Sequence, residues 1–324
     1  MRKIRPLNAA DLETVIAIDT ATTGISRRGY FEKRLETATS RPRDFVYSGL
    51  EVGGVLVGFA FAKLIDGEFG KPGAVATLDA IAVDPAHGHK GHGQALLDDL
   101  EKVLASKGVK ALYSQVEWEN AGMLGFLGKA RFELAPRVVL TRSTALMAQK
   151  LNEEREDQWD KEPDFSSPTG DASDALSNDR VIVRSMAEND LRKIISIDKA
   201  NTGADRTEYL TRKMHDTLHE SGVRVSLVAE MEGYPVGFIM ARVDFGEFGH
   251  ANAEAEMDTL GVDPSYQGHG VGRDLMAQLF ANLAVLRVDT IRTEIDWNDT
   301  GLITYLSAME FVPAQRLALA RALN

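Results

Sequence analysis

The chain repeats itself once, and this repeat limits the folds that it can adopt. The segment 16–24 (IAIDTATTG) matches 195–203 (ISIDKANTG), and Trp118 recurs as Trp297, with the same spacing of 179 residues in each pair. Solenoid repeats run about 20–50 residues, so a unit this long is a duplicated domain. A length of 324 residues fits the same interpretation, because one ordinary domain holds about 100–200 residues.

Charge divides the chain into three parts. Residues 1–150 carry a net charge of +3, residues 151–179 carry −8 and residues 180–324 carry −6. The middle part combines like charges with Ser, Pro and Gly, so we expect an acidic flexible linker between two domains. The acidic C-terminal half argues against a nucleic-acid partner and mildly favours a cationic small molecule or a basic peptide.

Composition and hydropathy indicate the cellular compartment of the protein. The chain has no cysteine, which excludes disulfides, thiolate nucleophiles and Cys-ligated metal sites. No apolar leader region follows the basic residues 2–5, and the longest apolar stretch, 53–62, is half the length of a membrane span. We therefore expect a cytoplasmic protein without membrane contact.

Each copy alternates helical and strand signals, which predicts an α/β fold with a mixed sheet in each half. In the second copy we expect helices at 186–198, 208–218, 272–286 and 300–308, and strands at 225–231, 235–245, 254–262, 290–297 and 317–321. In the first copy the corresponding last strand is expected at 138–142.

A strand that leads through glycines into a helix carries the chemistry. In the second copy the strand ends at Val262, and Gln267-Gly-His-Gly270-Val-Gly272 opens a helix. Glycines let backbone N–H groups approach an anion, and the helix N-terminus adds its positive dipole end. The loop therefore predicts a phosphate-binding site, although glycines alone are also typical of a tightly packed turn. Its spacing is not that of a dinucleotide-binding fingerprint.

These residues resemble the Q/R-x-x-G-x-G/A signature of the GNAT superfamily of N-acetyltransferases. The segment 298–311 is similar to the family's N-x-x-A-x-x-L-Y-x-K-x-G-F motif. It departs from that motif at Gly301, Thr304, Ala308 and Glu310. The resemblance implies two tandem GNAT-like domains, each a mixed, mostly antiparallel sheet flanked by helices, and it implies acetyl-CoA as cosubstrate.

The resemblance also assigns roles. The cofactor-binding residues it implies are Leu260, Gly261, Val262, Gln267, Gly268, His269, Gly270, Val271, Gly272, Arg273 and Asn298. An amine would attack the thioester directly, with backbone N–H groups near 260–262 as oxyanion donors and Tyr305 as the acid. Glu256 stands where the family's histone acetyltransferases carry their glutamate base.

Strand alternation places Glu254, Glu256 and Asp258 on one face. We expect their mutual repulsion to raise at least one pKa toward the range of a useful base, with Glu256 first and Asp258 second. The alternative is a solvated acidic face.

Comparing the copies suggests which half is active. At the 179-residue spacing, Thr77 stands for Glu256 and Phe126 for Tyr305. We therefore expect the C-terminal half to be catalytic and the N-terminal half to be degenerate. A second CoA site stays possible there; its candidate residues are Val83, Lys90, Gly91, His92 and Gly93.

The resulting hypothesis is an acetyl-CoA-dependent N-acetyltransferase that acts on a primary amine of a small molecule or peptide, as a monomer or homodimer. The alternative is a non-catalytic acyl-CoA sensor or scaffold. His87, His89 and His92 have loop spacing that a metal could use, but no carboxylate follows nearby, so we expect no metal.

Overall fold

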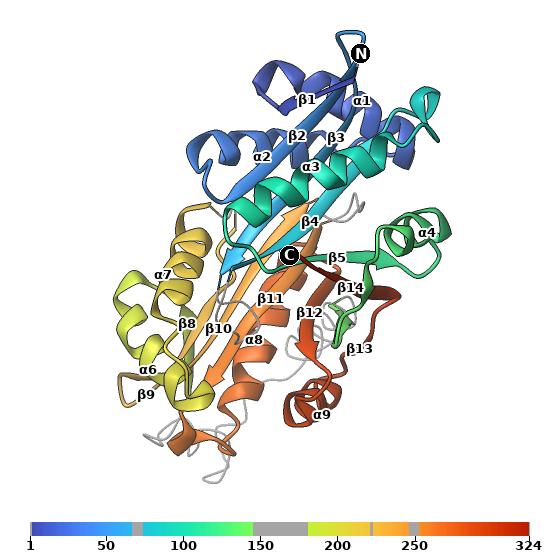
Figure 1. Cartoon of the computed structure of the whole chain (residues 1–324). Coiled ribbons are helices and arrows are strands. Elements are labelled where there is room, and N and C mark those ends of the chain that lie inside the picture. The colour runs from blue at the N-terminus through green and yellow to red at the C-terminus, as the bar shows by residue number, and fades with distance from the viewer. Residues whose placement is uncertain (1, 67–73, 145–180, 221–222, 246–252, 324) are drawn as a thin grey trace, which may run out of the picture.

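The computed structural model describes residues 2–66, 74–144, 181–220, 223–245 and 253–323. The expected linker, 151–179, lies outside the described residues. Two seven-stranded mixed sheets, each flanked by helices, make up this part of the chain (Figure 1). The two expected α/β units are therefore present.

The two copies have matching element orders. In the first copy the elements are β1 (Arg2–Pro6), α1 (Leu12–Thr23), α2 (Arg28–Ser40), β2 (Phe45–Val52), β3 (Val55–Asp66), β4 (Ala74–Val83), α3 (His92–Ser106), β5 (Ala111–Glu117), α4 (Ala121–Lys129), β6 (Glu133–Leu134) and β7 (Arg137–Ser143). In the second copy they are β8 (Ile182–Ser185), α6 (Leu191–Thr202), α7 (Thr207–His215), β9 (Leu227–Met231), β10 (Tyr234–Phe245), β11 (Ala253–Val262), α8 (Val271–Val285), β12 (Thr290–Asp296), α9 (Thr300–Ala308), β13 (Val312–Pro313) and β14 (Arg316–Ala322).

Local sequence explains where the first helix of each copy ends. Gly24 and Gly203 follow α1 and α6 with φ of 76° and 69°, a conformation that glycine adopts without a Cβ penalty. Next to each of these glycines, a buried ion pair joins the first helix to the start of the second. Arg206 Nε donates to Asp198 Oδ2 at 2.9 Å, and Arg27 does the same to Asp19.

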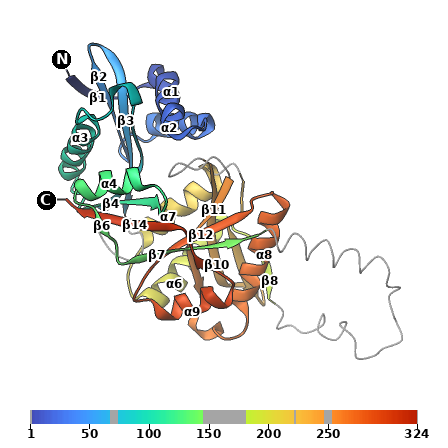
Figure 2. The same cartoon turned by 90° about the vertical axis from the view of Figure 1, so that its right-hand side faces the viewer.

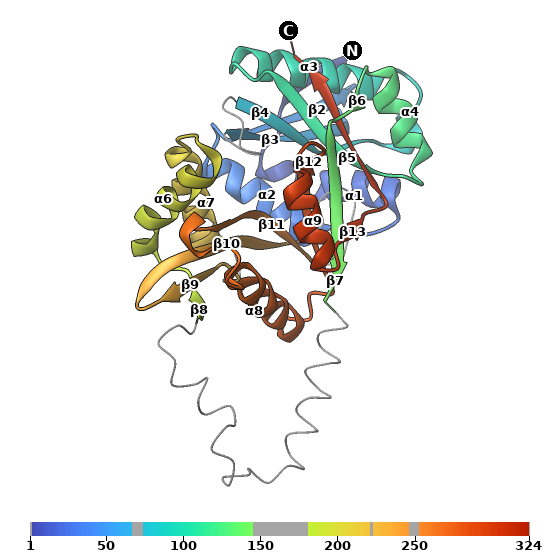
Figure 3. The same ribbon diagram turned by 90° about the horizontal axis from the view of Figure 1, so that it is seen from below.

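The last strand of each copy crosses into the sheet of the other copy. β7 pairs antiparallel with β12, from Arg137 opposite Asp296 to Ser143 opposite Thr290. β14 pairs antiparallel with β5, from Arg316 opposite Glu117 to Ala322 opposite Ala111. Figure 2 shows green β7 among the orange strands, and Figure 3 shows red β14 beside β5. The expected strands exist, and the last strand of each half completes the sheet of the other half.

Each sheet is covered on both faces. In the C-terminal sheet, α8 packs its leucines against Ala255 and Met257 of β11, while α6 and α7 cover the opposite face, against Phe238. Glu254 and Glu256 alternate with these buried positions along β11 and therefore lie on the α6–α7 face. Among the described residues, no helix is long and apolar enough to span a membrane.

Candidate functional site

The parallel strands β11 and β12 separate toward one end of the sheet. Their ladder joins only Ala255–Glu256 to Ile291–Arg292, although β11 runs on to Val262. Beyond the ladder, the edge of β11 that faces β12 includes residues 260–262, which were expected to supply oxyanion donors. A strand edge without its neighbour presents backbone N–H and C=O groups that a ligand can use.

The glycine loop lies directly after this edge. Asp263 starts it by accepting from the Ser265 backbone N–H at 3.1 Å. Gly268 and Gly270 then adopt φ of 81° and 85°, and Gly270 is the N-cap of α8. A Cβ at either glycine would meet nothing within 4 Å, so the backbone there is open to a ligand. Together with the orphan N–H groups of the first turn of α8, this arrangement suits a phosphate group.

Gln267, although exposed, links the loop to α6 and to the end of β11. Its Nε2 donates to Asn201 Oδ1 at 2.9 Å and contacts the Val262 carbonyl oxygen at 3.3 Å. Asn201, on α6, donates to the same Val262 oxygen at 3.0 Å. In this geometry the Gln267 amide positions the loop against α6 and the end of β11. His269 Nδ1 lies 3.0 Å from the Gln267 carbonyl oxygen, within the loop itself.

Tyr305 of α9 reaches the same helix start. Its hydroxyl donates to the Gly272 carbonyl oxygen at 2.7 Å, and burial raises the pKa of the phenol to about 12. A Cβ on Gly272 would lie 3.0 Å from the Tyr305 hydroxyl oxygen, so the ring packs closely against this glycine. Phe126 stands in the same relation to Gly93 in the first copy, where a Cβ on Gly93 would lie 3.1 Å from the Phe126 ring. Tyr305 and the glycine loop are therefore brought together.

The structure corrects the expected electrostatics of the acidic strand. Glu256 forms a hydrogen-bonded ion pair with Arg242 and lies 2.8 Å from an Arg292 nitrogen. Burial would raise the pKa of Glu256, but the charges of Arg242, Arg292 and Lys213 more than offset it and hold that pKa well below its usual range. For Glu256 the expected rise in pKa is wrong, because cations from other elements neutralise its carboxylate. Glu256 is a poor proton acceptor in this arrangement.

Asp258 also lies in an ion pair. It occupies a bulge in β11, because Ala241 pairs with Met257 while Met240 pairs with Thr259. Its carboxylate is 3.0 Å from Lys213 Nζ on α7, and both side chains are buried. The twin Asp79 occupies the same bulge in β4 and lies 3.3 Å from Arg34. A bulge and an ion pair that recur in both copies indicate a role in packing the second helix on the sheet.

Asn298 lies in the turn before α9. Its backbone N–H and its Nδ2 both donate to Asp296 Oδ1 at 3.0 Å, while Asp299 caps the helix through Leu302 N–H. Asn120 caps α4 at the position equivalent to Asp299. The side chain of Asn298 therefore shapes the turn that leads to Tyr305.

The loop of the first copy follows a similar backbone path with the same number of glycines, although Gly88 stands at the position of Gln267. His89 takes φ of 56° where the second copy has Gly268, and Gly91 takes 72° as the N-cap of α3. Val83 ends β4 just before it, and Gly93 lies in the first turn of the helix. The candidate second site thus keeps an open helix N-terminus. Within the described ranges no three His, Asp or Glu side chains converge to hold a metal ion.

Sequence reasoning missed the cations that surround the acidic strand. Arg292 is 2% exposed, and its Nε lies 3.0 Å from Glu254 Oε2. Arg316, which β14 carries into the other sheet, also pairs with Glu254 at 3.0 Å. The available signal was the arginine next to Ile291 within the predicted strand 290–297, since a charge that a sheet buries needs a partner.

Comparison with known proteins agrees with this geometry. The model of the acetyltransferase (GNAT) family matches residues 13–132 and 189–301. The N-alpha-acetyltransferase RimI of Mycobacterium tuberculosis is 43% identical over 70 residues, which are 21% of this chain and 39% of that protein. The match thus spans well under two thirds of that relative.

Two solved structures resemble the whole chain. A tandem GNAT protein from the clavulanic acid biosynthesis pathway matches with a TM-score of 0.63 at 15% identity, covering 100% of this chain and 99% of that one. A GCN5-related N-acetyltransferase from Sphaerobacter thermophilus matches with a TM-score of 0.59 at 14% identity, covering 100% and 96%. At these identities the likeness concerns the fold. Because the family model matches both copies over most of the chain, the protein belongs to the acetyltransferase (GNAT) family and carries two GNAT-like domains in tandem.

Proposed function

We propose that the protein transfers an acetyl group from acetyl-CoA to a primary amine of a small molecule or peptide, and that the reaction takes place in the C-terminal domain. The observation that best supports this proposal is that the open edge of β11, the glycine loop and the Tyr305 hydroxyl converge at the start of α8. The first copy has the first two features, but Phe126 replaces the phenol.

The residues have separate tasks in this proposal. Backbone N–H groups of the loop and of the first turn of α8 bind the diphosphate of acetyl-CoA, and the β11 edge near 260–262 stabilises the oxyanion. As the amine nitrogen bonds to the acyl carbon and the carbon–sulfur bond breaks, the proton of Tyr305 goes to the departing thiolate. The nitrogen releases a proton as it becomes an amide, and that proton restores the Tyr305 phenol by way of water. The phenol is protonated at neutral pH because its pKa lies at about 12.

The ion pairs of Glu256 bear on how the amine loses its proton. A carboxylate held ionised by two arginines does not take up a proton near neutral pH. We infer that the ammonium gives its proton to water before it attacks. The rate at low acceptor concentration should then rise with pH until the pKa of the acceptor amine is reached, and should follow that pKa when acceptors of different basicity are compared.

The direct test is thiol release from acetyl-CoA with a panel of amines, read together with the mass gain of the acceptor. Tyr305→Phe should lower kcat about 100-fold, within the range of general acid catalysis, and should leave CoA affinity unchanged. Phe126→Tyr is the matched control in the first copy and should change neither. Full activity of Tyr305→Phe would contradict the assigned acid. CoA binding without thiol release for any amine would favour the scaffold alternative.

A further inference from the structure

The residue that ends α9 has a backbone conformation typical of glycine. Glu310 takes φ of 63°, in the left-handed region that disfavours a side chain. Its backbone N–H donates to the Ser307 carbonyl oxygen, and that of Phe311 donates to the Leu306 carbonyl oxygen, both at 3.0 Å. Glycine at this position would close the helix at least as well. The helix end therefore does not require a carboxylate, and the contacts of the Glu310 side chain become informative.

That side chain reaches an arginine from the other half of the chain. Arg142 Nη2 donates to Glu310 Oε2 at 2.6 Å, and Arg142 belongs to β7, the strand that the first copy contributes to this sheet. The same guanidinium lies 3.9 Å from the centre of the Phe280 ring on α8, within cation–π distance. The rings of Phe280 and Phe311 are both buried, with centres 6.2 Å apart. Arg142 thus joins α8 to the end of α9.

The first copy makes a corresponding connection with different groups. Arg321, on β14, stands 179 residues after Arg142 and holds the equivalent position. It pairs with Glu101 of α3 at 2.7 Å and donates to the carbonyl oxygen of Ala130, at the end of α4, at 2.6 Å. Each exchanged strand therefore supplies an arginine that fastens the last helix of the other copy to the helix before it.

The position of Tyr305 depends on how α9 is held against α8. Its hydroxyl donates to the Gly272 carbonyl oxygen at 2.7 Å, and it lies five residues before Glu310, little more than one helical turn. α9 is thus attached to α8 at two points, through the phenol and through Arg142. When the phenol gives its proton to a thiolate, it no longer donates to Gly272. The connection through Arg142 then remains to hold the helix.

We propose that Arg142 is a positioning residue for the reaction in the C-terminal domain, because it holds the end of α9 on α8 and so keeps the Tyr305 hydroxyl in place. This role rests on the proposed acetyl transfer with Tyr305 as the acid. It gives the N-terminal half a part in turnover that does not depend on the first glycine loop.

Two variants break the connection at opposite ends. Arg142→Gln removes the cation, and Glu310→Gly removes the carboxylate while introducing the residue that a left-handed φ favours. Each should lower kcat for thiol release about tenfold and leave KM for acetyl-CoA unchanged, since a small displacement of a reacting group slows chemistry more than binding. Glu310→Gly should not lower the midpoint of thermal unfolding. A loss of turnover without a loss of stability separates positioning from a merely structural role.

Matched controls lie in the first copy. Arg321→Gln breaks the equivalent connection between α3 and α4, and Arg131→Gly makes the same backbone change as Glu310→Gly, at φ of 62°. Neither variant should change kcat, because α4 carries Phe126 where α9 carries the phenol. If either control lowers kcat as much as its partner in the second copy, the proposal is overturned.

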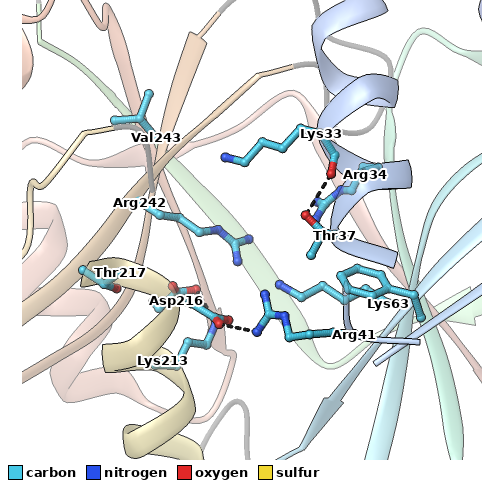
Figure 4. Close-up of a pocket in the computed structure, with 12 residues that line it drawn as sticks. Lys33, Arg34, Thr37, Arg41, Lys63, Lys213, Asp216, Thr217, Arg242 and Val243 are labelled. Carbon is cyan, nitrogen blue, oxygen red and sulfur yellow. Dashed lines mark hydrogen bonds and ion pairs between the residues drawn. The ribbon is translucent and has the colours of Figure 1, made fainter. Parts of the chain in front are cut away.

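A further control breaks a different ion pair between the two halves. Arg41, next to the end of α2, lies 2.6 Å from Asp216, which follows α7, and 3.9 Å from Asp44. Figure 4 shows Arg41 and Asp216 in the hollow where α2 and β3 face α7 and β10. Arg41→Gln should leave kcat unchanged, since it does not release α9. A loss as large as that of Arg142→Gln would show that any weakened contact between the halves lowers turnover, and would overturn the proposal.

A double-mutant cycle gives the sharpest test. In a Tyr305→Phe background, Arg142→Gln should cause no further loss of kcat, because the hydroxyl that it positions is gone. The same loss in both backgrounds would overturn the proposal, as would native kcat in both Arg142→Gln and Glu310→Gly. If Tyr305→Phe lowers kcat while these two variants do not, only the role of Arg142 fails. If Tyr305→Phe is fully active, the assigned acid fails as well.

Discussion

Replacing Arg292 by methionine should destabilise the protein strongly and in a pH-dependent way. The guanidinium is buried and lies 3.0 Å from Glu254 and 2.8 Å from Glu256. Removing one partner of a buried ion pair costs about 3–5 kcal/mol. Here each carboxylate keeps one other arginine, Arg316 or Arg242, so we expect a loss near the lower end, about 3 kcal/mol at pH 7.

The pH dependence follows from the lowered pKa of Glu256. A carboxylate with a depressed folded pKa contributes stability above its unfolded value of 4.5, and that contribution is lost as the pH falls toward the folded pKa. In Arg292→Met the pKa of Glu256 is less depressed, so its contribution at neutral pH is smaller. The difference between native and variant protein should therefore be full at pH 7 and should shrink below about pH 4.5.

Urea unfolding followed by circular dichroism measures this difference. The control is Arg28→Met, because Arg28 pairs with Glu13 at the surface, where both side chains are about half exposed or more, and its loss should leave stability nearly unchanged. A loss below about 1 kcal/mol for Arg292→Met, or one that stays constant between pH 7 and pH 4, would refute the reasoning from buried ion pairs.

Three other predictions concern the exchanged strands, the glycine loop and Tyr305. Cleavage at a protease site introduced in 151–179 should leave the two fragments bound to each other in size-exclusion chromatography, because each completes the other's sheet; separation without denaturant would contradict this. Gly272→Ala should weaken CoA binding and thiol release, since the new Cβ would lie 3.0 Å from the Tyr305 hydroxyl oxygen, whereas Gly93→Ala makes the equivalent contact with Phe126 and should leave turnover unchanged. Activity at saturating acceptor should not fall through ionisation of Tyr305 below about pH 10, since the pKa of that phenol is about 12; an earlier fall that Tyr305→Phe abolishes would argue against that environment.

The sequence allowed the repeated elements and the glycine loop to be predicted, because these features are local. Alternation places Glu254 and Glu256 on the side of the sheet opposite Met257. The glycines between 268 and 272 predict the turn into α8. The family resemblance implied Tyr305 as the acid, and in the structure its hydroxyl donates to the Gly272 carbonyl oxygen.

The sheet partners of the last strands and the partners of the carboxylates could not be predicted. The apolar pattern of a strand such as 316–322 does not show which sheet it joins. The sheets of both copies offer it an equivalent open edge, beside β5 in one and beside β12 in the other. Glu256 depends on Arg242 and Arg292, which are 14 and 36 residues away, and Glu254 on Arg316, 62 residues away. Only the folded arrangement shows that these cations reach the acidic strand.

The strand exchange affects how the nascent chain folds on the ribosome. β5 ends at Glu117, but the neighbour that completes this side of its sheet, β14, begins at Arg316. At about 5–20 residues per second, translation needs roughly 10–40 s to travel from one to the other. During that interval the edge of β5 has no β14 to cover it, so the first domain depends on late-made residues to finish folding, and chaperones that shield bare strands would have time to act.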